Sequence, residues 1–529
     1  MKSFHNRLSS ILEGIIEREF GLKLAPPLWG PSSKLEFGDL SSMVAMKLAS
    51  KLKKNPLQIA QTIKACLLKE VGDEVERIEI LKPAFINVIF SKQALIDSLN
   101  GLLNEGEDFF RQNIDEKVSI EFVSANPTGP LSIAHGRQAV VGDAIANILD
   151  FCGNEVSREY YVNDAGRQVD LLTESVRMRM CQINGEEFSI PEDGYHGEYV
   201  KDIAAICLKE NPHDLREFVL GQMITLIKDN LIKLGVKFDS WISQTKIIND
   251  GLVKKGIQAL DKNGYMYDKD GASWFASTKF GDDKDRVIQK ANGELTYFAS
   301  DIALHKIKAE RGHKKLINLW GPDHHGYIAR VKASMQALGY NENILNILII
   351  QLVSIKTKER MSRRKGTAIL LSDLVDDVGK DAARFYYLTR KNSSHLEFDI
   401  DLAKEKTFNN LLYYVQYGCA RIESIFRKSE IESFSSENNK FLEEGDLELV
   451  KTLLHFFYCL ENAYRSIEPV FVIEYLKNLS SVLHKFYENQ RVLSDDKNVT
   501  AARLNLLKAT KIVLHCALNL LGITPVEKM

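Results

Sequence analysis

Three patterns are missing from this sequence of 529 residues, and each absence excludes a class of protein. No apolar run approaches the roughly 20 residues that a membrane-spanning helix needs. The first residues continue into charged sequence, whereas an export signal would have an apolar core. The seven cysteines are scattered and none forms a C-x-x-C pair, which speaks against a zinc ribbon or a disulfide framework. We therefore expect a cytoplasmic protein with no membrane attachment.

A dominant charge of one sign is also missing. The 69 lysines and arginines nearly balance the 71 aspartates and glutamates, so the net charge is −2. A nucleic-acid partner would therefore need local basic patches. The content of hydrophobic residues, 45%, and of charged residues, 26%, is that of an ordinary globular protein. The length exceeds that of a single domain.

The most informative stretch lies between residues 118 and 149. Apolar residues alternate with polar ones at 118, 120 and 122, as in a strand, and asparagine, proline and glycine at 126–130 indicate a loop. An apolar stripe over residues 141–149 then indicates a helix. The start of this helix has free N–H groups and the positive end of the helix dipole, with His135 in its first turn, and such a place suits a nucleotide phosphate. By pattern alone, the stretch could also be a purely structural crossover.

The rest of the chain divides into regions of different pattern. Short apolar strands, among them residues 273–278 and 347–355, alternate with amphipathic helices and indicate an α/β fold with a doubly wound parallel (Rossmann-type) sheet. The sequence thus predicts an α+β domain at 1–112, an α/β domain at 113–394 with a helical insertion at about 180–250, and a helical bundle at 395–529.

A basic run, K-T-K-E-R-M-S-R-R-K-G, occupies residues 356–366. Taken alone, such a run is a solvated charged loop or a nonspecific anion site. It follows directly on a predicted buried strand, which argues for a more specific role.

These stretches resemble the bacterial arginyl-tRNA synthetases, which belong to class I of the aminoacyl-tRNA synthetases. E-F-V-S-A-N-P-T-G-P-L-S-I-A-H-G-R at 121–137 is similar to the family's form of the first class I signature, H-I-G-H, and R-M-S-R-R-K-G at 360–366 resembles the second, K-M-S-K-S. Y-V-N-D-A-G-R-Q at 161–168 is a nearly literal match. P-E-D-G-Y-H-G-E-Y-V at 191–200 also resembles a family segment, but we assign it no chemistry. The resemblance extends over nearly the whole chain.

Two departures from the family pattern affect the signatures. Ser132 and Ala134 replace the first histidine and the glycine of the first signature. Arg360 and Arg363 replace both lysines of the second, which keeps the charge but changes its geometry.

The resemblance implies an enzyme that joins L-arginine to tRNA(Arg). ATP, entering with Mg²⁺, would activate arginine as arginyl-adenylate with release of pyrophosphate, and the tRNA would then take the arginyl group and release AMP. The resemblance also implies that residues 1–112 contact the tRNA elbow and residues 395–529 the anticodon. Asp323, His324 and His325 raise the question of a metal site, but no further ligand stands at a suitable spacing, so we expect no protein-bound structural metal. We expect a monomer.

The resemblance further assigns site residues in three groups. The catalytic group comprises Ser132, His135, Arg360, Arg363 and Arg364. The nucleotide-binding group comprises Ser132, Ala134, His135, Gly136, Met361 and Ser362. The arginine-binding group comprises Glu121, Ser124, Ala125, Asn126, His135, Tyr297, Asp301 and His324.

Residue chemistry supports the arginine pocket but leaves alternatives open. A guanidinium is best bound by carboxylates, and Asp301 lies four residues after Tyr297, so both can lie on one helix face. Alone, Asp301 could be an ordinary carboxylate near a helix start. A non-catalytic tRNA-binding relative would explain Ser132 and Ala134. A class I synthetase for another amino acid is the other alternative, and Tyr297 with Asp301 speaks against an apolar substrate.

Overall fold

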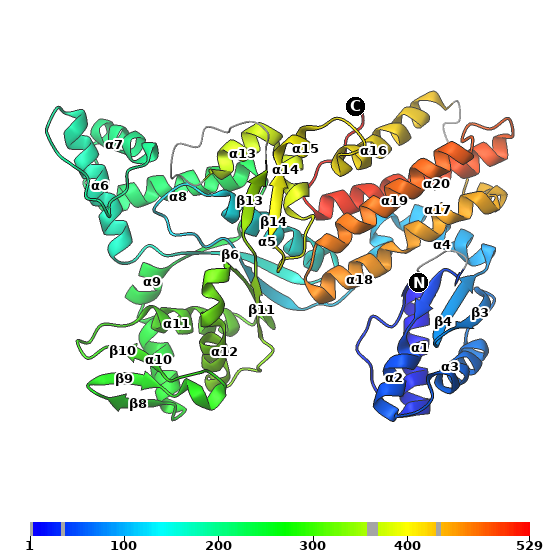
Figure 1. The fold of residues 1–529 in the computed structure, drawn as a ribbon, viewed down its shortest axis with the longest axis horizontal. Helices are drawn as coiled ribbons and strands as arrows, with labels where there is room; N and C mark the ends of the chain where they lie inside the picture. The colour runs from blue at the N-terminus through cyan, green and yellow to red at the C-terminus, as the bar shows by residue number, and fades with distance from the viewer. Residues whose placement is uncertain (1–3, 33–36, 357–368, 430–434) are drawn as a thin grey trace. The chain divides into compact units, whose positions relative to one another are not determined.

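The computed structural model describes residues 4–32, 37–356, 369–429 and 435–529 (Figure 1). Contacts divide the chain into two compact units, one made of Met1–Gln112 with Glu405–Met529 and the other of Asn113–Lys404. No helix among the described residues is long and apolar enough to cross a membrane.

A sheet of five parallel strands forms the centre of the unit Asn113–Lys404. Its strand order is β12-β11-β5-β6-β7, and every neighbouring pair is parallel. The strands are β5 (Lys117–Glu121), β6 (Glu155–Val162), β7 (Ser240–Ser243), β11 (Lys315–Trp320) and β12 (Leu345–Ile349). The chain proceeds from β5 to β6 and β7 on one side and later adds β11 and β12 on the other. The predicted doubly wound α/β fold is confirmed, and the carboxyl end of β5 lies at the reversal of strand order, where such sheets bind ligands.

Helix α5 (Ile133–Phe151) follows β5 and is almost wholly buried. Its close packing on the sheet depends on Gly142, where a Cβ would lie 2.3 Å from Cγ of Phe122. The helix ends at Cys152, and Gly153 follows it with a positive φ of 95°. The predicted order of strand, loop and helix is therefore confirmed.

The strand predicted over residues 347–355 is wrong in its length, because the structure has two strands there. β12 belongs to the parallel sheet, whereas β13 (Val353–Lys356) pairs in parallel with β14 (Leu396–Asp399). The backbone between β12 and β13 forms its hydrogen bonds with residues from other parts of the chain. The N–H of Gln351 donates to the carbonyl of Asn392 (3.0 Å), and the carbonyl of Gln351 accepts from the guanidinium of Arg137 (2.8 Å).

The strand predicted at 273–278 does not join the parallel sheet. It is β9 (Ala272–Phe275), which pairs antiparallel with β8 (Met266–Lys269) and β10 (Arg286–Gln289) in a separate sheet. Asp270 and Gly271, with φ of 52° and 75°, form the tight turn between β8 and β9. An Asp-Gly pair at such a turn favours a hairpin, and a hairpin is antiparallel.

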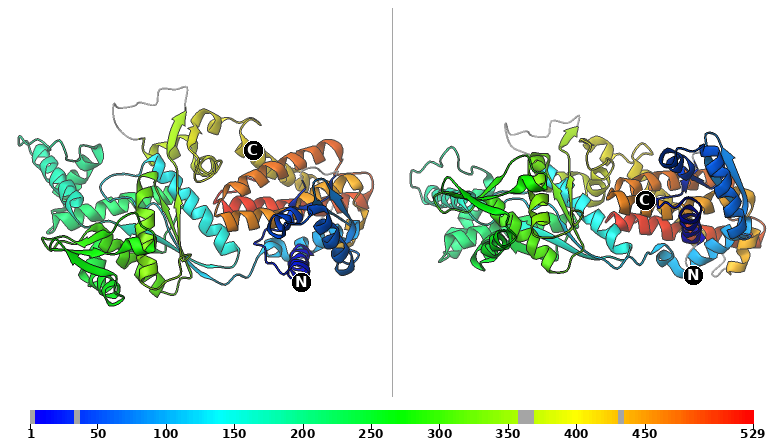
Figure 2. Two further views of the ribbon diagram at one scale, coloured as in Figure 1. Left: turned by 60° about the horizontal axis from the view of Figure 1, so that its bottom comes forward. Right: turned by 90° about the horizontal axis from the view of Figure 1, so that it is seen from below.

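Helices α6 (Arg167–Ile183), α7 (Glu198–Glu210) and α8 (Leu215–Lys233) form the insertion. They pack around a buried apolar cluster of their own that includes Leu172, Val200 and Met223. Figures 1 and 2 show α6 and α7, in turquoise, projecting from the parallel sheet of this unit. The other helices of the unit are α9 (Gln244–Asn249), α10 (Leu252–Lys262), η3 (Ser277–Phe280), α11 (Tyr297–Glu310), η4 (Pro322–Tyr327), α12 (Ile328–Ala337), α13 (Leu371–Val378), α14 (Lys380–Tyr387) and α15 (Ile400–Lys404).

The other unit begins with a small α+β fold. Its sheet has the order β1-β2-β4-β3 with every pair antiparallel. The strands are β1 (Gly30–Pro31), β2 (Leu40–Ser42), β3 (Val75–Leu81) and β4 (Phe85–Phe90). The helices are α1 (Phe4–Phe20), α2 (Val44–Leu52) and α3 (Pro56–Glu70).

The carboxyl-terminal part of this unit is helical (Figures 1 and 2). Its helices are α16 (Leu411–Lys428), η5 (Ser436–Phe441), α17 (Glu444–Leu454), α18 (Phe456–Ser466), α19 (Val470–Asn489) and α20 (Lys497–Leu520). Helix α4 (Lys92–Glu105) and η2 (Gly106–Phe110) pack against this bundle. The side chain of Lys92, for example, donates to the carbonyl of Leu442 (2.6 Å).

Candidate active site

The first signature lies at the amino end of α5, where Ser132 is the N-cap. Ser132 and His135 form a reciprocal capping box. The backbone N–H of Ser132 donates to Nδ1 of His135, and the Ser132 hydroxyl lies 3.1 Å from the same nitrogen. Because Nδ1 accepts, a neutral His135 has its hydrogen on Nε2. Burial lowers the pKa of His135, with a smaller opposing effect from Asp323, so the neutral ring dominates at pH 7.

Backbone hydrogen bonds fix this helix start to the chain that follows the second signature. The N–H of Ile133 donates to the carbonyl of Ile369 (3.2 Å), and the N–H of Leu371 donates to the carbonyl of Leu131 (2.8 Å). The second-signature residues Arg360, Met361, Ser362, Arg363 and Arg364 lie outside the described residues.

The two remaining residues of the nucleotide-binding group lie in the first turn of α5. Ala134 is half-buried, whereas Gly136 is buried against two neighbouring helices. A Cβ on Gly136 would lie 2.5 Å from the side chain of Leu371 and 2.7 Å from the hydroxyl of Tyr387. The close approach of α13 and α14 therefore requires glycine here.

Glu121, at the end of β5, is bound within the protein. It is only 5% exposed, and its carboxylate forms an ion pair with Lys308, which is fully buried on α11. The hydroxyl of Ser124 donates to the same carboxylate (3.0 Å) and accepts from the N–H of Tyr161 (3.1 Å). Burial by itself would raise the pKa of Glu121, but Lys308, His305 and the hydrogen bonds from Lys308 and Ser124 lower it below its ordinary value. Glu121 is therefore an ionised carboxylate with a protein cation as partner.

Asp301 is a second carboxylate close to Glu121, and its surroundings differ. Within the described part of the chain, Asp301 has no ion-pair partner, although the positive charge of Arg330 lowers its pKa slightly. Burial, followed by the charge of Glu121, raises the pKa of Asp301 to about 7. Tyr297, one turn earlier on α11, is 64% exposed. A Cβ on Gly166 would lie 3.6 Å from its hydroxyl, so Tyr297 lies over the start of α6.

The loop that joins β5 to α5 holds the other predicted residues of the arginine-binding group. Asn126 is held by two side chains, because its amide nitrogen donates to Gln168 (2.8 Å) and its amide oxygen accepts from Asn163 (3.0 Å). The carbonyl of Ala125 accepts from the hydroxyl of Tyr160 (3.0 Å).

His324 is placed differently from the rest of the group. It is exposed on η4, with Nε2 3.4 Å from a carboxylate oxygen of Asp323. Within the described ranges, no group of three histidine, cysteine, aspartate or glutamate residues could hold a metal ion.

The structure adds two residues that sequence reasoning missed, Tyr161 and Lys308. The buried hydroxyl of Tyr161 has no hydrogen-bond partner among the described residues. Burial raises its pKa, and the charges of Asp301, Glu121 and Asp164 raise it further, so the hydroxyl faces a cluster of carboxylates. Lys308 follows Asp301 by seven residues and so lies on the same helix face, which is a signal that the sequence did contain.

Family models of known proteins match three regions of the chain. The catalytic domain model of class I tRNA synthetases, described as "class I (R)", matches residues 98–191 and 203–427. The model of the arginyl tRNA synthetase N-terminal domain matches residues 3–90, and that of the DALR anticodon binding domain matches residues 415–529.

The similar proteins are arginine–tRNA ligases. That of Bacillus licheniformis is 42% identical over 514 residues, which cover 93% of this chain and 92% of the relative. That of Carboxydothermus hydrogenoformans is 40% identical over 546 residues, which cover 99% and 97%. The solved structure of Thermus thermophilus arginyl-tRNA synthetase, 20% identical, covers 99% of this chain and 100% of its own with a TM-score of 0.81, and so shares the fold.

The chain therefore belongs to the arginyl-tRNA synthetase family, as its signatures indicated. It is a ligase that aminoacylates tRNA with arginine and uses ATP, and the comparisons give no support to the alternative of a non-catalytic relative.

Proposed function

We propose that the protein charges tRNA(Arg) in two steps at the carboxyl end of β5. In the first step, a carboxylate oxygen of arginine attacks the α-phosphorus of ATP, and the bond to pyrophosphate breaks. In the second step, the terminal 2′-hydroxyl of the tRNA attacks the carbonyl carbon of arginyl-adenylate, and AMP leaves with the electrons of the broken bond. Mg²⁺ would accompany ATP and would offset the negative charge of its phosphates. The protein contributes mainly positioning and charge stabilisation.

The helix start at Ser132 supports an assignment as the nucleotide phosphate site. The first N–H groups of α5 and its dipole favour an anion. Nε2–H of a neutral His135 can donate to a phosphate oxygen, while Nδ1 remains engaged by Ser132. Arg360, Arg363 and Arg364 remain predicted ligands of the departing pyrophosphate.

The observation that carries the arginine assignment is the contrast between Asp301 and Glu121. Both are acidic, but Glu121 already has Lys308 as its cation, whereas Asp301 has no ion-pair partner among the described residues. A planar guanidinium donates to carboxylate and hydroxyl oxygens together. We assign Asp301, with Tyr297 and the hydroxyl of Tyr161, as the guanidinium site, and Ser124 and Asn126 as its neighbours in the β5–α5 loop.

ATP–pyrophosphate exchange and tRNA charging, measured with each amino acid and with and without tRNA(Arg), test this function. We expect exchange and charging with arginine only, when tRNA is present. Charging with another amino acid, or no charging of any amino acid, would overturn the proposal.

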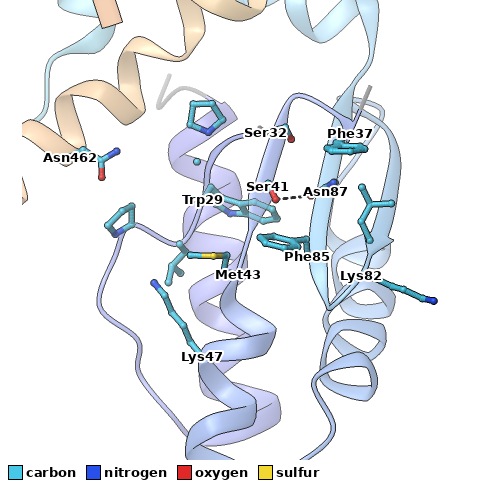
Figure 3. A pocket seen from close by; sticks show the side chains of 15 residues that line it. Trp29, Ser32, Phe37, Ser41, Met43, Lys47, Lys82, Phe85, Asn87 and Asn462 are labelled. Atoms are coloured by element: carbon cyan, nitrogen blue, oxygen red, sulfur yellow. Dashed lines mark hydrogen bonds between the residues drawn. The ribbon is translucent and has the colours of Figure 1, made fainter. Parts of the chain in front are cut away.

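A pocket lined by the small α+β fold, with Asn462 of α18 at its side, supports a tRNA contact by residues 1–112. It has a volume of about 590 Å³, and Figure 3 shows Trp29, Phe37 and Phe85 lining it together with Asn87. The hydroxyl of Ser41 donates to the Asn87 amide oxygen (2.7 Å), which leaves the amide N–H₂ as a donor. Aromatic faces beside an amide are what an unstacked nucleobase binds. We therefore propose that this fold contacts an unpaired base of the tRNA elbow, and that the helical bundle binds the anticodon.

A further inference from the structure

The segment at residues 191–200, which leads from α6 into the first turn of α7, has no part in the site described so far. It is packed firmly against α6. The N–H of Tyr195 donates to the hydroxyl of Ser175 (3.0 Å), and a Cβ on Gly194 would lie 3.1 Å from the same hydroxyl oxygen. The segment is therefore a well-built part of the insertion and holds the start of α7 in a definite place.

One side chain of this segment reaches out of the insertion. The ring of Tyr199, in the first turn of α7, packs against the apolar cluster of the insertion. Its hydroxyl donates to the backbone carbonyl of Thr128, 2.6 Å away in the β5–α5 loop. Tyr199 thus ties the insertion directly to the loop that we assign to arginine.

The β5–α5 loop depends on such external restraints. Val123 and Ser124 have positive φ values of 68° and 38°, which are costly for residues other than glycine. The N–H of Thr128 donates to the carbonyl of Asn126 (2.8 Å), so the bond from Tyr199 acts on the same turn as Asn126. The far end of the loop is held separately by the hydrogen bonds that join residues 131 and 133 to residues 369 and 371. Loss of the Tyr199 bond should therefore loosen the arginine side of the loop and leave the phosphate side in place.

We propose that Tyr199 is a positioning residue for arginine, through which the helical insertion fixes the β5–α5 loop in its binding conformation. Tyr199 does not touch the reacting atoms. This inference rests on the proposed assignment of Ser124, Asn126 and Asp301 to the arginine site.

The test compares Tyr199→Phe with Tyr195→Phe in the full-length enzyme. Each change removes one tyrosine hydroxyl from the same segment, and each keeps a ring in the apolar cluster. We expect Tyr199→Phe to raise the KM for arginine about five- to tenfold, the size of one lost hydrogen bond. The KM for ATP and kcat should stay within about twofold, and Tyr195→Phe should match the wild type in all three constants.

Thermal unfolding of both variants separates positioning from stability. A melting temperature near that of the wild type, together with the selective rise in arginine KM, supports the inference. An unchanged arginine KM, or equal changes in the constants for arginine and ATP, would overturn it. Asp301→Asn, assayed in parallel, reports on the arginine site itself. If Asp301→Asn raises the arginine KM and Tyr199→Phe does not, only the role of Tyr199 fails. If Asp301→Asn has no effect, the proposed arginine site fails.

Discussion

At the scale of single residues, two nearby carboxylates differ in role because their neighbours differ. Glu121 is held as an anion by Lys308 and Ser124. Asp301 has no cation in such contact among the described residues, and burial with the charge of Glu121 raises its pKa to about 7. A cationic substrate that approaches Asp301 relieves this unfavourable burial of charge. In the proposed arginine site, Asp301 is therefore the carboxylate whose energy should change most when arginine binds.

Asp301→Asn should weaken arginine binding far more than ATP binding. The change removes a charge-assisted hydrogen-bonded pair with the guanidinium, worth about 1.5–3 kcal/mol. We expect the KM for arginine in aminoacylation to rise about 10- to 150-fold, with the KM for ATP nearly unchanged. Glu310→Gln, at the exposed end of the same helix, is the matched control and should have no effect. A raised KM for ATP with an unchanged KM for arginine would contradict the assignment.

The raised pKa of Asp301 also predicts how arginine binding depends on pH. Arginine binds the ionised carboxylate, so above pH 7 the carboxylate is already in its binding form and the KM for arginine should be flat. Below pH 7, the proton on Asp301 must leave when arginine binds, and the KM should rise by up to about tenfold per pH unit. Glu121 and Arg330 are the charged groups that act on Asp301, and the pKa of Glu121 is lowered below its ordinary value, so Glu121 stays ionised across this range. If the KM for arginine of the wild type changed with pH no more than that of Asp301→Asn, the prediction would be contradicted.

Part of this pocket can be predicted from spacing, and part cannot. Tyr297 and Asp301 lie four residues apart, so a helix places both on one face. The pairing of Glu121 with Lys308 joins residues 187 positions apart, and only the packing of α11 against β5 and β6 brings them together. The resemblance placed Glu121 in the arginine-binding group, but its ion pair with Lys308 could not be predicted from the sequence.

At the scale of elements, the amino end of α5 combines structural and proposed catalytic roles in the same side chains. Ser132 caps the helix, and His135 completes the capping box. Further along, Arg137 is fully buried and donates to the carbonyls of Gln351, Lys391 and Ser394. These bonds fix α5 to the segments that precede β13 and β14. The orientation of the helix start is thus determined by contacts on both sides of the second signature.

Restoring the family form of the first signature tests what Ser132 and Ala134 contribute. Ser132→His with Ala134→Gly should lower the KM for ATP, because an imidazole reaches further than a hydroxyl and glycine lets adenine approach the backbone. The double change should also cost about 1–2 kcal/mol of stability, through the lost serine cap and a glycine in the first turn. Exchange assays with tRNA present and thermal unfolding measure the two effects. A wild type that is inert and is revived by the double change would instead indicate a degenerate relative.

The strand, loop and helix at residues 117–151 were predicted correctly, whereas the break in the apolar run at 347–355 and the pairing of β9 were not. The strand, loop and helix at residues 117–151 follow from period and turn residues. The apolar run over 347–355 has no internal signal for its break, because Arg137 and Asn392 from elsewhere in the chain bind the backbone at Gln351. The antiparallel pairing of β9 did have a local signal, which is the Asp-Gly turn before it. The prediction instead followed the alternation of strands and helices, which is typical of a parallel sheet.

At the scale of the whole molecule, a net charge of −2 means that tRNA binding cannot rely on a general positive field. Affinity must come from local contacts, and a pocket with aromatic side chains in its lining can supply one of them. The pocket around Phe85 and Asn87 lies in the unit that does not contain the parallel sheet. Changes there should therefore affect tRNA without affecting the chemistry of arginine or ATP.

Asn87→Ala should raise the KM for tRNA about fivefold, because it removes one amide donor to a base, worth about 1 kcal/mol. The KM values for arginine and ATP, measured with saturating tRNA, should not change. Asn104→Ala, which removes the same amide from an exposed position on α4, is the matched control. Because Asn87 is buried and bonded to Ser41, circular dichroism and thermal unfolding must first show that the variant is folded. A folded Asn87→Ala variant with an unchanged KM for tRNA would show that the pocket does not hold a base, and tRNA contact by residues 1–112 would then have to use another surface.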